Sequence, residues 1–465
     1  MNHQYITQYN VNINQYPLPD EQHWAVAGKQ ITLGDLHGNA LKLLYTLTRH
    51  GFIDISKRDY DKFVTIYHKK TLDRYDVQDF NAILKQIRIR TRAPQALLRL
   101  IGDVVADRGA NDYFTLKILK KLRDNGVPVV NMISNHDAEF IECYEKGKLF
   151  DENRLGLQAR SAGNLQKLID QGLIETQEVV ELIKAYKPTL RALDYSLNAA
   201  KNKITIYSHG VIGLENINYI AEALGMNGVH CDEHSSAIEI AQIIEEINIR
   251  FAVQVKESTV SELLKLDSVD SRAINGVAPI DPQAFAFAHL VWNRDANSLK
   301  RPEHINFVHG HDMKDKTINN IFNLDNLLGK APERHIGTYN SLFSNEITLR
   351  TQLTPPLTPP LTPPVAEITA PIPAEPPVGT ILYRAPKPIA SVQPVSSPAS
   401  LDEELEEGWV TVEAPKEDLP MVQNKNSGWF PSLTNWLWKS DQGIVDSDYS
   451  ATVQPPKPGQ DNRLT

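Results

Sequence analysis

The sequence predicts an α/β fold in which a largely buried sheet is covered by helices. Short apolar runs alternate along the chain with segments of helical spacing, a pattern typical of strands joined by helices. Five of the six runs end in Asp, Asn or His beside Gly or Ser, and sites collect at the carboxyl ends of strands in open α/β sheets. The fold is limited to part of the chain, because 20 of the 29 prolines follow Arg350.

Six apolar runs are predicted strands, because they are rich in Ile, Val and Leu and are bounded by turn residues. They occupy residues 29–35, 96–103, 127–135, 203–210, 305–311 and 345–349. Apolar residues at helical spacing predict helices between the strands. The helices cover residues 40–50, 111–125, 157–171, 176–187, 217–224 and 236–249.

Two intervals between the strands are too long for simple crossovers. We interpret residues 54–95 and residues 140–200 as helical insertions that cap or wall a site, and we expect the second to be entirely helical. The basic run "ILKQIRIRTR" in the first insertion is interpreted as a solvated helix face rather than a nucleic-acid contact. The net charge of −9 also argues against a protein that binds nucleic acid through a basic surface.

Composition divides the chain into an N-terminal extension (residues 1–19), a globular domain (residues 20–350) and a proline-rich tail (residues 351–465). The tail contains the repeat "LTPPLTPPLTPP", so polyproline II and disorder are expected there. Two cysteines exclude a disulfide scaffold and fit a reducing compartment. We expect a monomer with no secretory signal peptide and no membrane-spanning helix.

Side chains that can bind metals gather at the predicted strand ends. In "GDLHG" (residues 34–38), Asp35 and His37 are two positions apart and face the same side of an extended segment. A turn followed by a helix N-cap is the structural alternative for any one such cluster. The pattern recurs, however, in "GDVVADRG" (102–109), "SNHD" (134–137), "YSHG" (207–210), "LVWNRD" (290–295) and "VHGHD" (308–312).

The residue types in these clusters fit one kind of chemistry. Asp, Asn and His supply oxygen and imidazole ligands suited to Mn, Fe or Zn. Two such ions about 3.5–4 Å apart need a bridging carboxylate, and Asp103 lies between the first cluster and the later ones. Arginines hold phosphate oxygens with a planar fork, and a histidine can protonate a leaving alkoxide. The inventory predicts a two-metal site acting on a phosphoryl group.

The ordered motifs resemble the calcineurin-like metallophosphoesterases and, within them, the phosphoprotein phosphatase branch. That branch carries GD-x-HG, GD-x-x-DRG and GNH[ED], followed by separate His-containing strand ends, and the likeness covers most of residues 30–350. The resemblance implies a sandwich of two β-sheets flanked by helices, with residues 20–350 as the metallophosphatase catalytic domain. It also implies two divalent metal ions as cofactors, with Mn as the expected metal and Fe or Zn as the alternatives.

Matching the motifs residue by residue implies a set of metal ligands. Two of them would bind the first ion, one would bridge, and three would bind the second ion. In that order they are Asp35 and His37, then Asp103, then Asn135, His209 and His311. The last motif offers two histidines; His311 is chosen because the family ligand follows Gly, and His309 is the alternative.

The same matching implies the catalytic groups. His136 would be the general acid, oriented by Asp107, while Arg108 and Arg294 would grip the phosphate, with Asn135 also touching it. Arg294 matches a W-x-R element of bacterial members. The chain departs from the family in the extra residue of "GDVVADRG" and in "SNHD", which has Ser where Gly is usual and Asp for the common Glu. In the later run "IFNLDNLLGK", Asp325 and Asn326 are interpreted as structural.

The two insertions, the "ADRG" variant and the proline-rich tail resemble the Wip group of bacterial effector phosphatases, which a type IV secretion system delivers into a host cell. That resemblance implies host phosphoproteins as substrates and the host cytosol as the place of action, with an endomembrane or lysosomal surface as a narrower alternative. Phosphoserine and phosphothreonine are favoured over phosphotyrosine. A nucleotide or phosphodiester hydrolase is the second alternative, and a non-enzymatic adaptor is the last.

The tail holds one apolar segment, residues 427–440, with the sequence "SGWFPSLTNWLWKS". Its aromatic and leucine residues recur at helical spacing, so most of them would share one face. Tryptophan-rich amphipathic helices lie in membrane interfaces. Docking on a groove of a host protein is the equal alternative.

Overall fold

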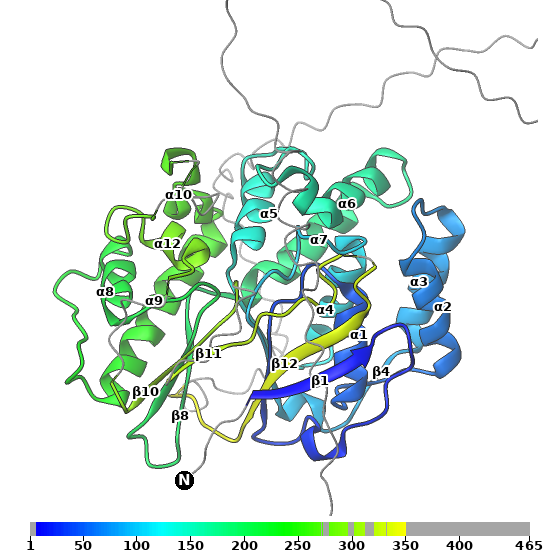
Figure 1. Ribbon diagram of the computed structural model, residues 1–465. Coiled ribbons are helices and arrows are strands. Elements are labelled where there is room, and N and C mark those ends of the chain that lie inside the picture. Colours follow the sequence, from blue (N-terminus) through cyan, green and yellow to red (C-terminus); the bar gives the residue numbers. More distant parts are fainter. Residues whose placement is uncertain are drawn as a thin grey trace, which may run out of the picture. The chain divides into compact units, whose positions relative to one another are not determined.

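Two β-sheets form the framework of the domain, as the sequence predicted (Figure 1). The computed structural model describes residues 6–270, 272, 279–295, 302–311, 320–331 and 333–349. The larger sheet has six strands, in the order β1 (Ile6–Asn12), β12 (Ile336–Ser344), β2 (Gln30–Leu33), β5 (Leu97–Leu100), β6 (Val129–Met132) and β7 (Leu190–Arg191). The second has four, in the order β11 (Ile321–Asn323), β10 (Ile305–His309), β9 (Ile204–Tyr207) and β8 (Asp194–Leu197).

The strands that lead to the predicted site are parallel within each sheet. Strands β2, β5, β6 and β7 run parallel, and so do β9, β10 and β11. Strands β1, β12 and β8 are antiparallel to their neighbours. Because parallel strands end at the same edge of a sheet, the loops after β2, β5 and β6 meet there, as do those after β9 and β10.

Helices pack around both sheets. In Figure 1, α8, α9, α10 and α12 lie on the side of the four-stranded sheet, and α9 contacts β7, β8 and β9. The helices are α1 (Ala40–Arg49), α2 (Lys57–Tyr67), α3 (Arg74–Gln86), α4 (Asp112–Asp124), α5 (Asn135–Glu145), α6 (Arg160–Asp170), α7 (Thr176–Tyr186), α8 (Leu214–Ala223), α9 (Ala237–Glu257), α10 (Val260–Leu264) and α12 (Ala286–Trp292). Short 3-10 helices include η3 (Gly156–Ala159) and η4 (Lys187–Thr189).

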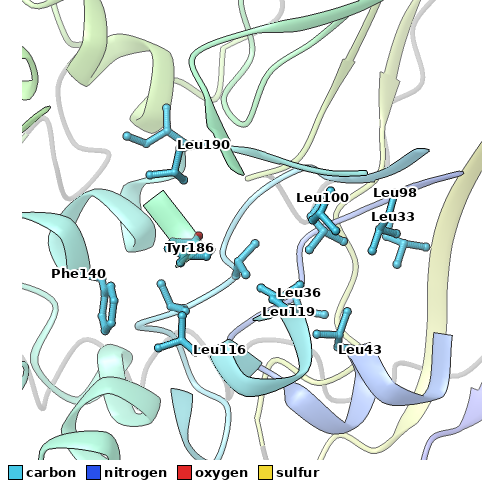
Figure 2. Packing of buried hydrophobic residues seen from close by; sticks show 14 of the residues in the cluster. Leu33, Leu36, Leu43, Leu98, Leu100, Leu116, Leu119, Phe140, Tyr186 and Leu190 are labelled. Atoms are coloured by element: carbon cyan, nitrogen blue, oxygen red, sulfur yellow. The ribbon is translucent and has the colours of Figure 1, made fainter. Parts of the chain in front are cut away.

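The main hydrophobic core extends over the helices of both sheets, and part of it lies between the six-stranded sheet and helices α1 and α4. Figure 2 shows Leu36, Leu43 and Leu119 gathered near the strand residues Leu98 and Leu100. All five side chains are fully buried, which removes apolar surface from water and is the main source of stability here. The helices that hold this core also fix the loops at the strand ends.

The structure corrects four details of the sequence prediction. Residues 6–12 of the predicted extension form β1, the edge strand beside β12, so the sheet begins before residue 20. The last strand is Ile336–Ser344; in the predicted segment 345–349, Ile347 makes only an isolated bridge to Leu197. Neither strand has a continuous apolar run: β1 is a partly buried edge strand, and β12 carries polar residues among its buried positions.

The remaining corrections concern the insertions and one predicted strand end. Interval 140–200 is mainly helical but contains strands β7 and β8, and interval 54–95 contains α2, α3 and the short strand β4 (Arg88–Ile89), paired with β3 (Ile53–Asp54). The run "LVWNRD" follows helix α12 rather than a strand. The tail beyond residue 350, including residues 427–440, lies outside the described residues. Among the described residues, no helix is long and apolar enough to cross a bilayer.

Candidate metal centre

The loops after five parallel strands converge on one buried cluster of acidic, amide and imidazole side chains. Asp35 follows β2, Asp103 follows β5, Asn135 follows β6, His209 follows β9 and His311 follows β10. All five residues are buried. The sequence places them up to 276 positions apart, and the sheet order brings them together.

The first donor group consists of Asp103, Asn135, His209 and His311. His209 Nε2 lies 2.9 Å from Asn135 Oδ1, 3.1 Å from His311 Nδ1 and 3.3 Å from Asp103 Oδ1. The opposite ring nitrogen of His209 is 3.0 Å from the carbonyl oxygen of Ile101. Its donation to that carbonyl leaves Nε2 as the unprotonated nitrogen, which is the form that binds a metal.

The second donor group consists of His37, Asp103 and Asp107, whose ligand atoms all lie within 4.8 Å of one another. Asp103 belongs to both groups, as a bridging carboxylate requires. His37 Nε2 lies 3.4 Å from Asp325 Oδ1, and Asp35 accepts a 2.9 Å hydrogen bond from the backbone nitrogen of His311. The two groups therefore adjoin through one shared side chain.

Unpartnered buried atoms indicate that this cluster is built for cations. Asp35 Oδ1, Asp103 Oδ1 and His311 Nε2 have no hydrogen-bond partner and no exposed surface. Such atoms are costly to bury unless something binds them. All three are acceptors or potential acceptors, so a cation satisfies them and an anion does not. The oxygen and imidazole set fits hard or borderline divalent ions.

The backbone of the cluster is held in unusual conformations. His37, Asp103, Ala106 and His311 have φ values of 61°, 51°, 52° and 61°. The left-handed region is disfavoured for residues with a Cβ, and such strain concentrates at functional sites. Gly310 is required for a different reason: a Cβ there would lie 1.8 Å from Asp35 Oδ1.

Burial and neighbouring charges shift the pKa values of the residues in the cluster. Burial, with repulsion from Asp325 and Asp103, raises the pKa of Asp35 well above its usual value. For His37 burial acts in the opposite direction, but hydrogen bonds to Asp107 and Asp325 raise the pKa to about 9. Burial lowers the pKa of His311 well below its usual value, and the charge of Arg294 adds to the effect. Carboxylates that repel one another gain most when a cation joins them.

The extra residue of "GDVVADRG" is accommodated by side chains from three helices. The backbone nitrogen of Val105 donates to Asp137 Oδ1 (3.2 Å), that of Ala106 to Asp112 Oδ2 (2.8 Å), and that of Asp107 to Ser161 Oγ (3.1 Å). These acceptors come from α5, α4 and α6, so three consecutive donors of the loop are each satisfied by a different helix.

The backbone carbonyl of Ala106 holds one ring nitrogen of His136, and Asp107, the predicted orienting residue, lies near the other. His136 Nδ1 lies 2.5 Å from the carbonyl oxygen of Ala106, whereas the contact to Asp107 joins Nε2 to Oδ1 at 3.6 Å, which is beyond hydrogen-bond range. Asp107 instead bonds His37 (3.1 Å) and Arg108 (2.8 Å). Holding Nδ1 as the donor leaves Nε2 of His136 facing Asp107 and the cluster.

Two of the three predicted phosphate-contacting residues lie near the metal cluster. Arg108 donates to Asp107 Oδ1 and, at 2.6 Å, to Gln158 Oε1, and its side chain is 29% exposed. Asn135 is buried beside His209. Arg294 is exposed and follows α12; it is close enough for its charge to affect His311. Its predicted role stays a prediction.

The choice between the two histidines of "VHGHD" can be compared with their positions. His311 is in the donor group with Asp103 and His209. His309 is also buried, but its Nδ1 lies 2.8 Å from the carbonyl oxygen of Gly310 and it belongs to neither group. The geometry therefore favours His311.

Three residues that support the cluster had no signal in the sequence analysis. Lys42, on the first turn of α1, is buried and donates to the carbonyl oxygens of Asp35 (2.5 Å) and Leu328 (3.0 Å) and to Asn326 Oδ1 (3.2 Å). Burial lowers its pKa to about 8 although Asp325 and Asp35 oppose the shift. Ser161 and Asp112 act on the loop of Ala106, as described above. A buried lysine at a helix start has no distinguishing spacing, so only the fold identifies it.

Comparison with known proteins decides the family. A family model described as "WipA-like, phosphatase domain" matches residues 97–330, half of the chain. The crystal structure of the phosphatase domain from the Legionella effector WipB matches with 31% identity and a TM-score of 0.54, over 64% of this chain and 100% of that one. The chain belongs to the WipA-like phosphatase domain family. The sequence-based resemblance to the Wip group is confirmed, and the fold is that of a phosphatase domain.

Two further matches are more remote. Structures of a cold-active protein tyrosine phosphatase and of the enzyme from a psychrophilic Shewanella share 14% identity, each with a TM-score of 0.31. They cover 71% of this chain and 77% or 78% of their own chains. No curated protein matched the sequence.

Proposed function

We propose that the chain is a metal-dependent protein phosphatase that hydrolyses phosphomonoesters by direct attack of water. The observation that carries the proposal is the pair of buried donor groups that share Asp103, within a domain of a phosphatase family. His37 and Asp103 of the second group, with Asp35, whose Oδ1 is buried and unpartnered, would hold one divalent ion, while Asp107 bonds His37 and Arg108. Asn135, His209 and His311, with Asp103, would hold the other. When bound, two such ions supply Lewis acidity for the phosphoryl oxygens and lower the pKa of the attacking water.

The residues of the chain supply the remaining chemistry. Arg108 presents guanidinium N–H groups to the phosphate oxygens, and Arg294 is assigned a second contact of the same kind. His136, with Nδ1 held by the carbonyl of Ala106, keeps Nε2 available to give a proton to the leaving oxygen. Lys42 places a buried positive charge behind Asp35 and so steadies the acidic cluster.

Phosphoserine and phosphothreonine are the proposed substrates. The phosphoprotein phosphatase resemblance supports this choice, with phosphotyrosine as the alternative. Since a relative in the same family is a Legionella effector, we further propose that this chain is an effector that acts on host phosphoproteins in the host cytosol. Mn is the proposed metal. Residues 427–440 would target the enzyme by binding to a membrane surface or to a host protein.

The test is a hydrolysis assay on an aryl phosphate and on peptides that carry phosphoserine, phosphothreonine or phosphotyrosine. Each substrate is assayed with Mn²⁺, Mg²⁺, Zn²⁺ or a chelator. We expect metal-dependent turnover, abolished by the chelator and fastest on phosphoserine or phosphothreonine. His136→Ala should lower kcat on peptides about 10²–10³-fold, while His234→Ala, at a histidine whose side chain is 86% exposed, should not. Equal rates for His136→Ala and wild type would remove the general-acid assignment.

A further inference from the structure

The guanidinium of Arg108 is clamped at both ends. One terminal nitrogen donates to Asp107 Oδ1 at 2.8 Å, and the other donates to Gln158 Oε1 at 2.6 Å. A guanidinium has five N–H donors in a fixed plane. The two contacts use two of them and fix the plane, so the others remain in a defined direction for a ligand.

Gln158 belongs to a segment that is anchored independently of Arg108. It lies in η3, between the end of α5 and the start of α6. Upstream, Arg154 bonds Glu139 Oε1 at 2.9 Å and also bonds Glu142, and both carboxylates are on α5, the helix that begins with Asn135 and His136. These ion pairs tie the segment to the helix that carries the catalytic histidine.

The downstream side of the segment is anchored on the loop of Arg108 itself. Ser161 Oγ accepts from the backbone nitrogen of Asp107 at 3.1 Å, and the backbone nitrogen of Ser161 donates to the carbonyl oxygen of Asp107 at 2.9 Å. A Cβ on Gly38 would lie 2.7 Å from Ser161 Oγ, so the two loops are in close contact. Gln158 is therefore presented to Arg108 from a fixed position three residues away.

We propose that Gln158 is a positioning residue for phosphate binding, which holds the guanidinium of Arg108 in the orientation that accepts a phosphate monoester. The inference rests on the proposed function and names a residue of the inserted segment that takes part in it. Without the Gln158 acceptor, Asp107 alone would hold the guanidinium, and the partly exposed side chain of Arg108 would be able to rotate away from the site. The cost should appear as weaker phosphate binding rather than as slower chemistry.

A purely structural role predicts a different result. Gln158 is only half-buried, and its contact with Arg108 is the single side-chain hydrogen bond that the structure records for it. Replacing it by Leu removes the acceptor at similar size. A structural role would lower the unfolding temperature and reduce the active fraction, which lowers apparent kcat and leaves KM unchanged.

The experiment uses the full chain loaded with Mn²⁺ and compares wild type, Gln158→Leu, Arg108→Ala and the double variant. We expect Gln158→Leu to raise KM for an aryl phosphate about fivefold with kcat within about twofold. The inhibition constant for inorganic phosphate should rise by the same factor. Calorimetry with inorganic phosphate reads the same loss without turnover. Gln177→Leu is the matched control, since Gln177 is exposed on α7 and, within the described part of the chain, its side chain donates one hydrogen bond, to Glu181.

The double variant separates positioning from an independent effect. In the Arg108→Ala background, Gln158→Leu should change KM and phosphate affinity by less than about 1.5-fold, because the group it positions is gone. Equal effects in both backgrounds would overturn the proposal, as would a rise of less than about twofold in KM for Gln158→Leu alone. If Gln158→Leu does not fold, Gln158→Asn, whose shorter side chain cannot reach Arg108, takes its place. If the wild type is inactive but binds phosphate, the proposed function is contradicted. The role of Gln158 is then still tested, because calorimetry measures phosphate binding without turnover.

Discussion

Two buried polar clusters share the same strands and are built in opposite ways. In β2 and β5, Thr32 and Arg99 belong to a cluster between the two sheets. After the ends of these strands, Asp35 and Asp103 belong to the candidate metal centre. The inter-sheet cluster pairs its one buried cation with a carboxylate, whereas the metal centre gathers carboxylates that repel one another. We therefore expect the inter-sheet cluster to stabilise the fold and the other cluster to bind cations.

The inter-sheet cluster is centred on the fully buried Arg99. Its Nε donates to Asp194 Oδ2 at 2.8 Å, and its terminal nitrogens donate to Thr32 Oγ1 and Gln30 Oε1, each at 3.0 Å. The guanidinium also lies 3.8 Å from the ring centroid of Tyr207. One cation faces one carboxylate, and neutral acceptors take the other donors, which is the arrangement a buried charge needs.

The metal centre has the reverse balance. Asp35, Asp103, Asp107 and Asp325 meet there. Among the described residues, Lys42 donates to the backbone carbonyl of Asp35 and Arg108 donates to the carboxylate of Asp107. Burial, followed by repulsion from Asp325 and Asp103, raises the pKa of Asp35, and a divalent ion would relieve that repulsion. A mutation should therefore affect stability in one cluster and activity in the other.

The largest expected effect is on activity. Asp103→Asn removes the carboxylate shared by both donor groups, and hydrolysis of an aryl phosphate should fall about 10³-fold. The free energy of unfolding of the chelated protein should not fall, because a charge that repels Asp35 is lost. Steady-state kinetics and urea unfolding check the two parts. Activity within tenfold of wild type, or a clear loss of stability, would contradict the assignment.

The second effect falls on stability. Arg99→Met leaves the carboxylate of Asp194 buried without its cation and should cost about 3–5 kcal/mol in urea unfolding. Arg250→Met, at an exposed pair with Glu246, is the matched control and should cost less than about 1 kcal/mol. Adding Asp194→Leu to Arg99→Met should restore most of the stability. If the two single variants lose equal stability, the contrast between the clusters fails.

The fold of the site was predictable from sequence because its motifs are local. "GDLHG" and "SNHD" each place ligands on a turn that follows an apolar strand, and the run before each turn is β2 or β6 as expected. Strands β1 and β12 were missed because polar residues interrupt both sequences, so neither has a continuous apolar run. The paired residues of β1 and β12 are at least 324 positions apart in the sequence, so no local stretch of sequence indicates that the two strands pair.

The site was predictable in its residue types but not in its connections. The sequence shows that "GDVVADRG" has one extra residue. It does not show that the carbonyl of Ala106 holds His136, because that contact depends on the left-handed φ of 52° at Ala106. Gln158 and Ser161 are ordinary polar residues in an insertion, and only the packing of α6 against the loop of Asp107 brings them to the site. Long-range contacts of single polar side chains have no periodic signal.

A third buried group extends the comparison to pH. Burial lowers the pKa of His50 to about 3, and its Nε2 lies 3.0 Å from the Tyr339 hydroxyl. In the unfolded chain, His50 takes up a proton below its ordinary pKa near 6.5, whereas the folded chain resists protonation down to about pH 3. This contribution to the free energy of unfolding is therefore fully present above pH 6.5 and is lost towards pH 3, at about 1.4 kcal/mol per pH unit. His50→Gln should therefore lose less stability than wild type between pH 7.5 and pH 5. Parallel curves in urea unfolding would rule out this contribution.

The smallest expected effect concerns the anchor of Gln158. Arg154→Met removes the ion pairs with Glu139 and Glu142, so the segment that holds Gln158 should loosen while Arg108 itself stays unchanged. KM for an aryl phosphate should rise about twofold and kcat should be unaffected. Lys184→Met, at an exposed pair with Glu181 on α7, serves as the control. A fall in kcat with unchanged KM would show that these ion pairs act on His136 instead.

The central claim is that the shared carboxylate of Asp103 and its neighbours form a two-ion centre. The most direct measurement is a calorimetric titration of Mn²⁺ into the metal-free full chain, with the bound metal counted after gel filtration. The structure predicts about two ions per chain, and Asp103→Asn should retain none tightly. Full occupancy in Asp103→Asn, or no tight binding to wild type, would contradict the claim.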